Sequence, residues 1–586
     1  MIRTAFLLAL FAAPLAQAAP DPLSTVAERS GFRETGRYEE VVKLCAAFQR
    51  AYPKAARCFE FGRTPEGRPM LALAVSRSGA LSAEQAKRRG LPVLLVQGGI
   101  HAGEIDGKDA GFLALREALE GRAAPGALAR QVLLFVPVFN VDGHERFGQW
   151  NRPNQRGPVA MGWRTTAQNY NLNRDYVKAD APEMQAMLAL VNAWDPLAYV
   201  DLHVTDGAKF QPDVSIQVEP VHAGDAALRQ AGVALRDAVM ADLREQGSLP
   251  QSFYMSFAVE DDPLSGFVDQ VSPPRFSTGY FMLRNRFCML VETHSWKDYP
   301  TRVRVTKNTI VSMLTQVAEH GAAWRETARQ ADLRAAGLGG TQVALSYTAG
   351  PQARTIDFPG YAYTRTLSEV SGASMTRYDE NTPQVWSVPL RDQIDPDLQV
   401  TAPTGGYLVP AALAAQVGAK LRQHGVAYSV QKNGQDRAEV EVFRASATKL
   451  SAQSNEGHQT LKVDGAWAKE TRTLAAGALF VPIAQPKARL VMTLFEPQGA
   501  DSLLAWGVFN TAFERKEYME DYVAEDVARE QLAADPALAA AFRARLDGDA
   551  DFAKSASARL EFFARRHASW DERFNLYPVL RTAAVP

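Results

Sequence analysis

The sequence lacks an excess of charge of either sign. Its 65 acidic and 64 basic residues leave a net charge of −1 over 586 residues. A protein that binds nucleic acid needs a surplus of Lys and Arg on at least one face, because contacts to phosphate supply most of the affinity. We therefore expect no nucleic acid among the partners of this chain.

Long apolar runs are equally scarce, and one of them stands within the first 18 residues. This stretch, MIRTAFLLALFAAPLAQA, joins a basic residue, a short apolar core and an Ala-x-Ala site. That order is typical of a secretory signal peptide. We predict cleavage near Ala19 and a periplasmic or secreted location. No later run approaches the roughly 20 apolar residues that span a bilayer, so we expect no membrane span in the mature chain.

Cysteine is rare, with three residues in the whole chain. Cys45 and Cys58 lie close enough in sequence to bridge a first helix and a first strand, as cysteines do in an oxidising compartment. Two small buried thiols fit the same pattern, so the pairing stays open at this stage. Cys288 falls in an apolar stretch and is expected in the core.

The length of the chain exceeds that of one ordinary domain, and two or three domains are expected. In the first half, patterns of buried strands alternate with patterns of helices, which predicts an α/β fold with a mixed, mostly parallel sheet flanked by helices. The second half alternates apolar and polar residues between Gly and Pro turns, which predicts an α+β accessory region. The predicted division is a signal peptide over residues 1–18, the α/β domain over 19–336, a β-rich/α+β accessory domain over 337–510 and a mostly helical segment over 511–586.

The clearest chemical feature is the stretch Val93–Gly107, which reads VLLVQGGIHAGEIDG. Its apolar start predicts a buried strand, and its paired glycines end that strand before a helix begins. His101 and Glu104 stand between the two, at the strand end where open α/β sheets place their ligands. An imidazole and a carboxylate on one turn can bind the same zinc ion. A solvated loop with a glutamate at a helix start gives the same spacing, so a metal site needs further ligands from elsewhere.

His203 can supply the third ligand. It directly follows a predicted strand, Leu197–Leu202, and two histidines with one glutamate are the donor set of many catalytic zinc sites. Asp201 and Asp206 are close enough in sequence to orient its imidazole. These three ligands leave one coordination position of the zinc ion open, and a water bound there can become a nucleophile.

Glu292 is the candidate general base. It ends the apolar strand Phe287–Thr293, and burial there raises the pKa of a carboxyl toward the range of a proton shuttle. A structural carboxylate is the alternative reading of this position. We predict that one zinc ion is bound by His101, Glu104 and His203, and that Glu292 activates the water.

Asn173 and Arg174 form a candidate binding site for a carboxylate. They follow a long polar loop and come just before a predicted helix. An amide beside a guanidinium can hold a carboxylate through a bidentate pair and one further hydrogen bond. An ordinary loop arginine paired with Asp175 is the alternative.

Two further roles have more than one candidate. Arg152 and Arg156, in the same long loop, are candidates to stabilise an oxyanion, because a cation aimed at developing charge favours the transition state. Tyr280 is a candidate hydrogen-bond donor to the substrate, and Tyr254 competes for that role.

Together these motifs resemble the zinc carboxypeptidases of the carboxypeptidase A type over about residues 35–335. The motifs that carry the resemblance are His101-Ala102-Gly103-Glu104, Asn140-Val141-Asp142-Gly143, Asn173-Arg174, His203 and Glu292. The resemblance implies an exported zinc-dependent carboxypeptidase, which hydrolyses the C-terminal peptide bond of a peptide through a metal-activated water. It also implies that Glu292 is the general base and acid and that Asn173 and Arg174 hold the terminal carboxylate.

Two other functions remain open from the sequence. The span from Glu104 to His203 is shorter than in the pancreatic type, and the motifs are also similar to those of zinc deacylases of the aspartoacylase type. Such an enzyme would remove an acyl group from an N-acyl amino acid. A non-catalytic binding module is the third possibility, and the complete set of ligands and base argues against it.

Overall fold

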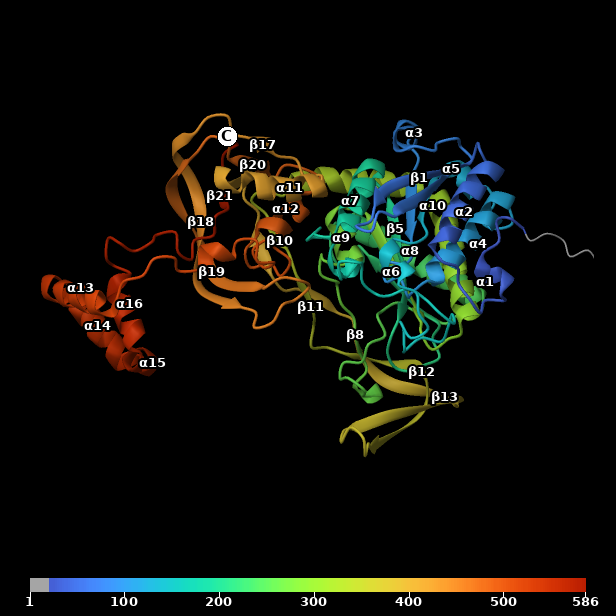
Figure 1. The fold of residues 1–586 in the computed structure, drawn as a ribbon. Helices are drawn as coiled ribbons and strands as arrows, with labels where there is room; N and C mark the ends of the chain where they lie inside the picture. Colours follow the sequence, from blue (N-terminus) through green and yellow to red (C-terminus); the bar gives the residue numbers. More distant parts are fainter. Residues whose placement is uncertain (1–20, 586) are drawn as a thin grey trace, which may run out of the picture.

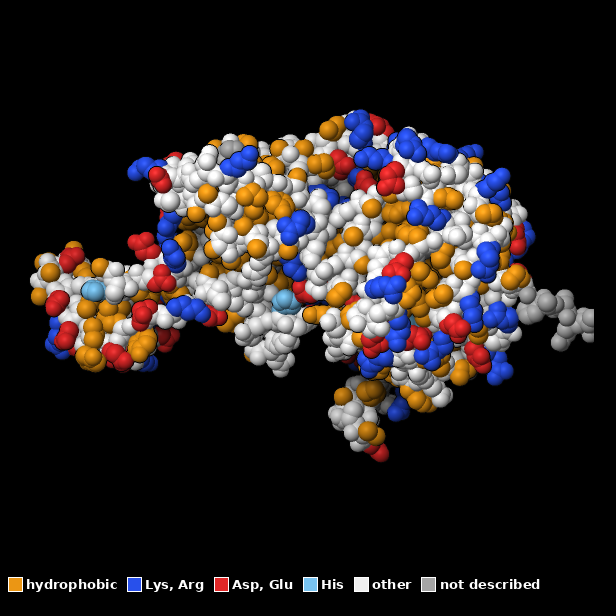
Figure 2. Space-filling view, turned by 45° about the horizontal axis from the view of Figure 1, so that its top comes forward, with side chains coloured by type: hydrophobic (Ala, Val, Ile, Leu, Met, Phe, Trp, Pro, Cys, Tyr) orange, Lys and Arg blue, Asp and Glu red, His pale blue; other side chains and the backbone are white. Residues whose placement is uncertain are grey.

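The computed structural model describes residues 21–585, and the predicted signal peptide lies outside the described residues. Figure 1 shows an α/β half beside a sheet-rich half. A long hairpin, residues 354–391, projects below the α/β half, and a small helical module projects from the sheet-rich half. None of the helices among residues 21–585 is both long enough and apolar enough to cross a membrane. On the face shown in Figure 2, basic and acidic side chains are interspersed, as the near-zero net charge leads one to expect.

The first half is built on an eight-stranded sheet. In sheet order its strands are β1 (Ala56–Arg63), β2 (Pro69–Val75), β4 (Val132–Val136), β3 (Val93–Gln97), β5 (Ala198–Thr205), β9 (Phe287–His294), β6 (Val214–Glu219) and β7 (Pro250–Gln251). The pairs β4/β3, β3/β5, β5/β9 and β6/β7 are parallel, and the other three pairs are antiparallel. The predicted mixed, mostly parallel sheet is therefore confirmed.

The central strands are buried on both faces. Every residue of β3, β4 and β5 is buried. Since alternate residues of a strand point to opposite faces, helices and loops must cover both sides of the sheet. The helices of this half are α1 (Val26–Arg29), α2 (Tyr38–Ala51), α3 (Ala83–Arg88), α4 (Asp106–Glu120), α5 (Ala127–Arg130), α6 (Val141–Glu145), α7 (Pro182–Trp194), α8 (Ala226–Glu245), α9 (Ser277–Leu283) and α10 (Tyr299–Ala336).

The strand order places three chain segments at one edge of the sheet. β3, β5 and β9 are neighbours and run parallel, so their carboxyl ends lie together. Gln97 is the register partner of Asp201, and His203 is the partner of Glu292. The segments that follow β3, β5 and β9 therefore meet beyond this edge, where an open α/β sheet binds its ligands.

The second half contains a six-stranded sheet and several smaller ones. The six strands, in sheet order, are β17 (Ser429–Val430), β20 (Leu479–Pro482), β16 (Gly406–Val409), β21 (Leu580–Thr582), β18 (Gln435–Leu450) and β19 (Leu461–Leu474). The helices are α11 (Ala414–His424), α12 (Ala488–Phe495), α13 (Asp521–Ala534), α14 (Pro536–Gly548), α15 (Ala550–Lys554) and α16 (Ala556–Ala564). Because β21 lies between β16 and β18, the chain returns to this sheet after the helical module.

One sheet joins the two halves. The hairpin of β12 (Arg354–Leu367) and β13 (Ser374–Arg391) pairs with the short strand β8 (Phe267–Val268) of the first half. The remaining short strands, β10 (Gln342–Ala344) with β15 (Gln399–Thr401) and β11 (Tyr347–Ala349) with β14 (Ile394–Pro396), form two-stranded ladders. The hairpin packs on the loop after β7 through an aromatic cluster that includes Phe253, Phe358 and Trp386.

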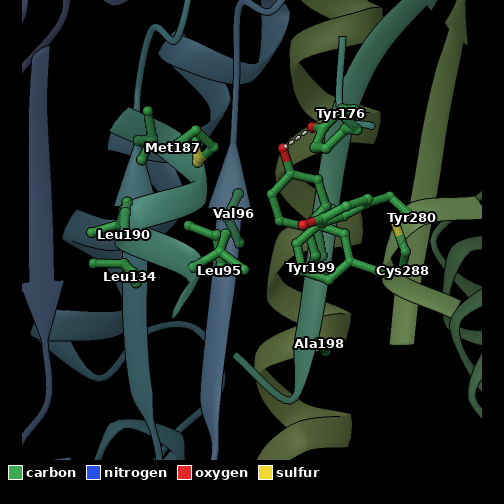
Figure 3. Packing of buried hydrophobic residues seen from close by; sticks show 14 of the residues in the cluster. Leu95, Val96, Leu134, Tyr176, Met187, Leu190, Ala198, Tyr199, Tyr280 and Cys288 are labelled. Carbon is green, nitrogen blue, oxygen red and sulfur yellow. Dashed lines mark hydrogen bonds between the residues drawn. The ribbon is translucent and has the colours of Figure 1, made fainter. Parts of the chain in front are cut away.

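The two halves also share one hydrophobic core. Buried residues of β3 and β5 belong to the same cluster as Tyr407 of β16 and Leu490 of α12. In the region drawn in Figure 3, Tyr199 and Tyr280 lie beside Cys288, which confirms that this cysteine is a core residue. The relative placement of the halves is therefore set by burial of apolar surface.

A disulfide joins Cys45 of α2 to Cys58 of β1. The sequence was compatible with either a disulfide or two buried thiols at these positions, and the structure contains the disulfide. A cross-link over so short a loop stabilises the folded chain by about 3 kcal/mol in the chain-entropy account.

Candidate active site

Three predicted metal ligands converge at the carboxyl edge of the sheet. Each residue offers one ligand atom, and the three atoms, from His101, Glu104 and His203, lie within 4.8 Å of one another. All three residues are buried. The Nδ1 atoms of the two imidazoles lie 2.9 Å from the two carboxylate oxygens of Glu104. Two imidazole nitrogens and a carboxylate oxygen fit a zinc ion and leave one position for a water or substrate.

Each imidazole is oriented from its other side. Nε2 of His101 lies 3.1 Å from Oδ1 of Asn171. Nε2 of His203 lies 3.1 Å from Oδ1 of Asp201, whose second oxygen accepts a hydrogen bond from Ser277. Such partners hold the proton on Nε2 and leave the Nδ1 lone pair for a metal. This contact agrees with the expected orienting role of Asp201, whereas Asp206 pairs with Arg152 instead.

The protonation of the site also suits a cation. Burial lowers the pKa of His101 to about 4, so its ring is neutral at physiological pH. Burial also lowers the pKa of His203, but the Asp201 and Glu104 carboxylates outweigh it and raise that pKa well above its usual value. A bound cation would replace that proton, as metal ions do at histidine ligands.

Glu292 faces the same point from the neighbouring strand. It is the register partner of His203 and lines the cavity that also exposes His101 and Glu104. Burial raises the pKa of its carboxyl, and the nearby Glu104 and Asp201 carboxylates raise it further. A carboxyl with such a pKa can both accept and return a proton near neutral pH.

The predicted carboxylate-binding pair lies in the same cavity. Asn173 and Arg174 are in the short 3-10 helix η1 (Leu172–Arg174), and both line a cavity of about 370 Å³ together with the three ligands and Glu292. The Arg174 guanidinium donates a hydrogen bond to the Asn173 carbonyl oxygen and lies 4.2 Å from the centre of the Phe276 ring. Burial and the like charge of Arg164 lower the pKa of Arg174, so an anionic ligand is favoured there.

Arg152 does not reach the cavity, contrary to its predicted role. Its Nη1 lies 2.9 Å from Oε1 of Glu104, and its Nη2 donates to the Val204 carbonyl oxygen and lies 3.1 Å from Asp206. A Cβ atom on Gly103 would stand 2.6 Å from Cγ of Arg152, so a glycine at that position makes room for the arginine. Arg152 thus supports the candidate metal ligand Glu104 from behind, and these contacts occupy its guanidinium.

Arg156 points away from the site as well. Its guanidinium pairs with both carboxylate oxygens of Glu380 on the β13 side of the hairpin, and its side chain is 44% exposed. Of the arginines in the long loop, Arg164 is the one that lines the cavity, and its Nη1 lies 3.5 Å from Oε1 of Glu104. We did not select Arg164 from the sequence. The available signal was that it is closer in the chain to Arg174 than either predicted arginine.

The predicted role of Tyr280 as a hydrogen-bond donor to the substrate is also wrong. It is fully buried in α9, and its hydroxyl pairs with Nδ1 of His424 from α11 at 3.0 Å. Figure 3 shows it within the core beside Tyr199. Tyr254, the competing candidate, lines the cavity, and its hydroxyl accepts a hydrogen bond from Thr205.

Residues 41–213 match the family model described as zinc carboxypeptidase. They belong to a zinc carboxypeptidase domain. The matched segment includes the three clustered ligands, Asn173 and Arg174. A domain of this family makes the chain a metal-dependent peptide hydrolase.

Solved structures similar to the chain are also metallocarboxypeptidases, at low identity. A metallo-carboxypeptidase from Burkholderia cenocepacia is 17% identical, with 48% of this chain and 68% of that chain covered and a TM-score of 0.35. Carboxypeptidase A from Helicoverpa armigera is 15% identical, with 49% and 73% covered and a TM-score of 0.35. A metallo-carboxypeptidase from Pseudomonas aeruginosa is 14% identical, with 47% and 69% covered and a TM-score of 0.34. No curated protein matches the chain.

Proposed function

We propose that the zinc carboxypeptidase domain removes the last residue of a peptide, with one zinc ion held by His101, Glu104 and His203. The observation that carries the proposal is that these three ligands share one cavity with Glu292 and Arg174. A ligand set, a base and an anion-binding arginine are the parts that hydrolysis next to a free carboxylate requires.

Asn173 and Arg174 select the substrate in this proposal. The Arg174 guanidinium donates two parallel hydrogen bonds to the terminal carboxylate, and the Asn173 amide adds a third. Holding the carboxylate places the last peptide bond at a set distance from the metal ligands. Tyr254, from the loop that follows β7, covers the bound residue from the solvent side.

Glu292 and Arg164 carry the proton and charge changes. Zinc, when bound, polarises the carbonyl and makes water a stronger nucleophile at neutral pH. The Glu292 carboxylate takes a proton from the attacking water and returns it to the leaving amine. The Arg164 guanidinium stabilises the negative charge that develops on the carbonyl oxygen. Arg164 replaces Arg152 and Arg156 as our candidate for that role.

Export completes the proposal. The first 18 residues carry the signal-peptide pattern, and the Cys45–Cys58 disulfide suits an oxidising compartment. On this basis we propose that the protein is located in the periplasm or outside the cell. A fusion of residues 1–25 to a reporter that is active only after export tests this location. Retention of the reporter in the cytosol would contradict it.

The decisive test of the reaction compares three substrates. An N-blocked dipeptide with a free C-terminus should be cleaved, whereas its C-terminal amide should be cleaved far more slowly because Arg174 loses its anionic partner. N-acyl amino acids test the deacylase alternative. Cleavage of the N-acyl amino acids but not of the dipeptide would replace the carboxypeptidase by a deacylase. Equal turnover of the acid and the amide would remove the carboxylate-binding role of Asn173 and Arg174. A chelator should abolish either activity.

A further inference from the structure

A buried aspartate of the second half reaches the wall of the cavity. Asp501 follows α12, and its side chain is 1% exposed. One of its oxygens accepts a hydrogen bond from the backbone N–H of Arg275 at 3.0 Å, and the other accepts one from the Arg275 guanidinium at 2.9 Å. The Trp506 indole N–H donates to the same carboxylate at 3.2 Å. Asp501 therefore fixes both the backbone and the side chain of a residue that lines the cavity.

The residue next to Arg275 touches the substrate-binding arginine. The Phe276 ring lies under the Arg174 guanidinium, 4.2 Å from its carbon, and both residues line the cavity. A planar guanidinium stacks well on an aromatic face. Since the Asp501 contacts hold the neighbouring backbone, they also set the position of the ring on which Arg174 rests.

A second set of contacts starts at Trp506. This side chain is buried, and its ring lies 4.8 Å from Nζ of Lys178. The same Nζ donates a hydrogen bond to the backbone carbonyl oxygen of Arg174 at 2.7 Å. Trp506 thus supports the main chain of Arg174 through Lys178, while Asp501 supports its guanidinium through Phe276.

We propose that Asp501 and Trp506 are positioning residues for Arg174. The segment that contains them, residues 501–506, belongs to the half of the chain that the sequence indicated was only accessory. The Arg174 side chain itself has one hydrogen bond, to the carbonyl oxygen of the preceding residue. A flexible guanidinium with so few partners of its own needs support from its surroundings to bind a carboxylate in one orientation. This inference rests on the proposed role of Arg174 in binding the terminal carboxylate.

The test is a pair of conservative substitutions read out by binding. Asp501→Asn keeps the volume of the side chain but removes the charge that holds Arg275. Trp506→Phe keeps a ring near Lys178 but removes the N–H that bonds Asp501. For an N-blocked dipeptide with a free C-terminus, Asp501→Asn should raise KM by about tenfold with a smaller effect on kcat, because a loosened carboxylate contact mainly affects binding. Trp506→Phe should raise KM in the same direction. Inhibition by the released amino acid should weaken in parallel.

Glu496→Gln is the matched control. Glu496 is also a buried carboxylate of the second half, and it pairs with Arg581 and Tyr407 without lining the cavity. Its substitution should lower the melting temperature without changing KM. A KM that rises equally in Glu496→Gln and Asp501→Asn would overturn the inference, because general loosening of the second half would then explain both.

A double-mutant cycle separates this inference from the proposed function. Arg174→Gln should raise KM, and adding Asp501→Asn to it should change KM little further, because the residue that Asp501 positions is already gone. If Asp501→Asn has the same effect in both backgrounds, or leaves KM unchanged in the wild-type background, it does not act through Arg174. If Arg174→Gln itself leaves KM unchanged, the proposed carboxylate-binding site fails and this inference fails with it.

Discussion

His203 and Glu292 are direct partners in the parallel ladder between β5 and β9. Paired residues on adjacent strands point to the same face of a sheet, so the third candidate metal ligand and the candidate base project into one space. Each is the sixth residue of its strand, and the strand register holds the two side chains at a constant relative position. A rigid pair of this kind suits a reaction in which a proton moves between a water near the metal and a carboxylate.

The first prediction concerns Glu292. Glu292→Gln keeps the size of the side chain and removes its ability to accept a proton, so kcat should fall by about 10²–10⁴-fold. The zinc content should stay at one ion per chain, because Glu292 is not among the three clustered ligands. Steady-state kinetics with the free-acid dipeptide and elemental analysis of the purified variant measure the two effects. Turnover near the wild-type rate would remove Glu292 as the base.

The second prediction distinguishes the arginines of the long loop. Arg164→Gln should lower kcat by about 10²–10³-fold, the loss expected when a group that stabilises an oxyanion is removed. Arg156→Gln should leave kcat nearly unchanged, since Arg156 pairs with Glu380 outside the cavity. The opposite ranking of the two variants in the same assay would return the role to Arg156.

The third prediction concerns metal removal. A ligand that binds only the folded state stabilises it, by about 4 kcal/mol when its concentration is 1,000 times Kd. Chelation should therefore lower the melting temperature, and added zinc should restore it. Glu292→Gln should show the same zinc-dependent shift as the wild type, whereas His101→Ala should show little or none. A melting temperature of His101→Ala that still rises with zinc to the wild-type extent would place the metal elsewhere.

The fourth prediction concerns pH and Glu183, the second residue of α7. Its side chain is buried, and this burial raises the pKa of its carboxyl from 4.5 to about 7. The folded state thus keeps a proton that the unfolded state loses at lower pH. The stability that this group contributes is fully present below pH 4.5 and is lost as the pH rises through 7, by about 3 kcal/mol at most.

Glu183→Gln should remove that part of the pH dependence. The variant should melt at a higher temperature than the wild type at pH 8, and the difference should shrink toward pH 4.5. Calorimetry across this range measures it. Glu326→Gln, at an exposed position on α10, is the control and should shift the melting temperature little at any pH. A constant difference between Glu183→Gln and wild type over the whole range would show that the Glu183 carboxyl does not titrate as described.

The local sequence was sufficient to predict the framework of the site. The apolar run at Val93 predicted a buried strand, and the structure has β3 there with all five residues buried. The apolar strand predicted over Phe287–Thr293 is also present, as β9 (Phe287–His294). His101, Glu104 and His203 could be grouped from the sequence because each follows or flanks a strand end, and parallel strands bring such ends together.

The loop residues of the site were not predictable in the same way. Arg152, Arg156 and Arg164 occupy one irregular segment with no periodic pattern, so nothing in their spacing states which guanidinium points into the cavity. The position of the Arg152 side chain depends on Gly103, which leaves room for it. The position of the Arg156 side chain depends on its ion pair with Glu380. Both positions are set by contacts across the fold.

By itself, therefore, the sequence determined which strands and helices form and which side chains stand at the strand ends, because hydrophobic periodicity and turn residues act over short distances along the chain. Only the tertiary structure decided that Arg164 and Tyr254 line the cavity, that Tyr280 is a core residue against His424, and that Asp501 supports the wall beside Arg174. These outcomes depend on packing between segments far apart in the chain, and that packing is set by shape, burial and charge pairing in three dimensions.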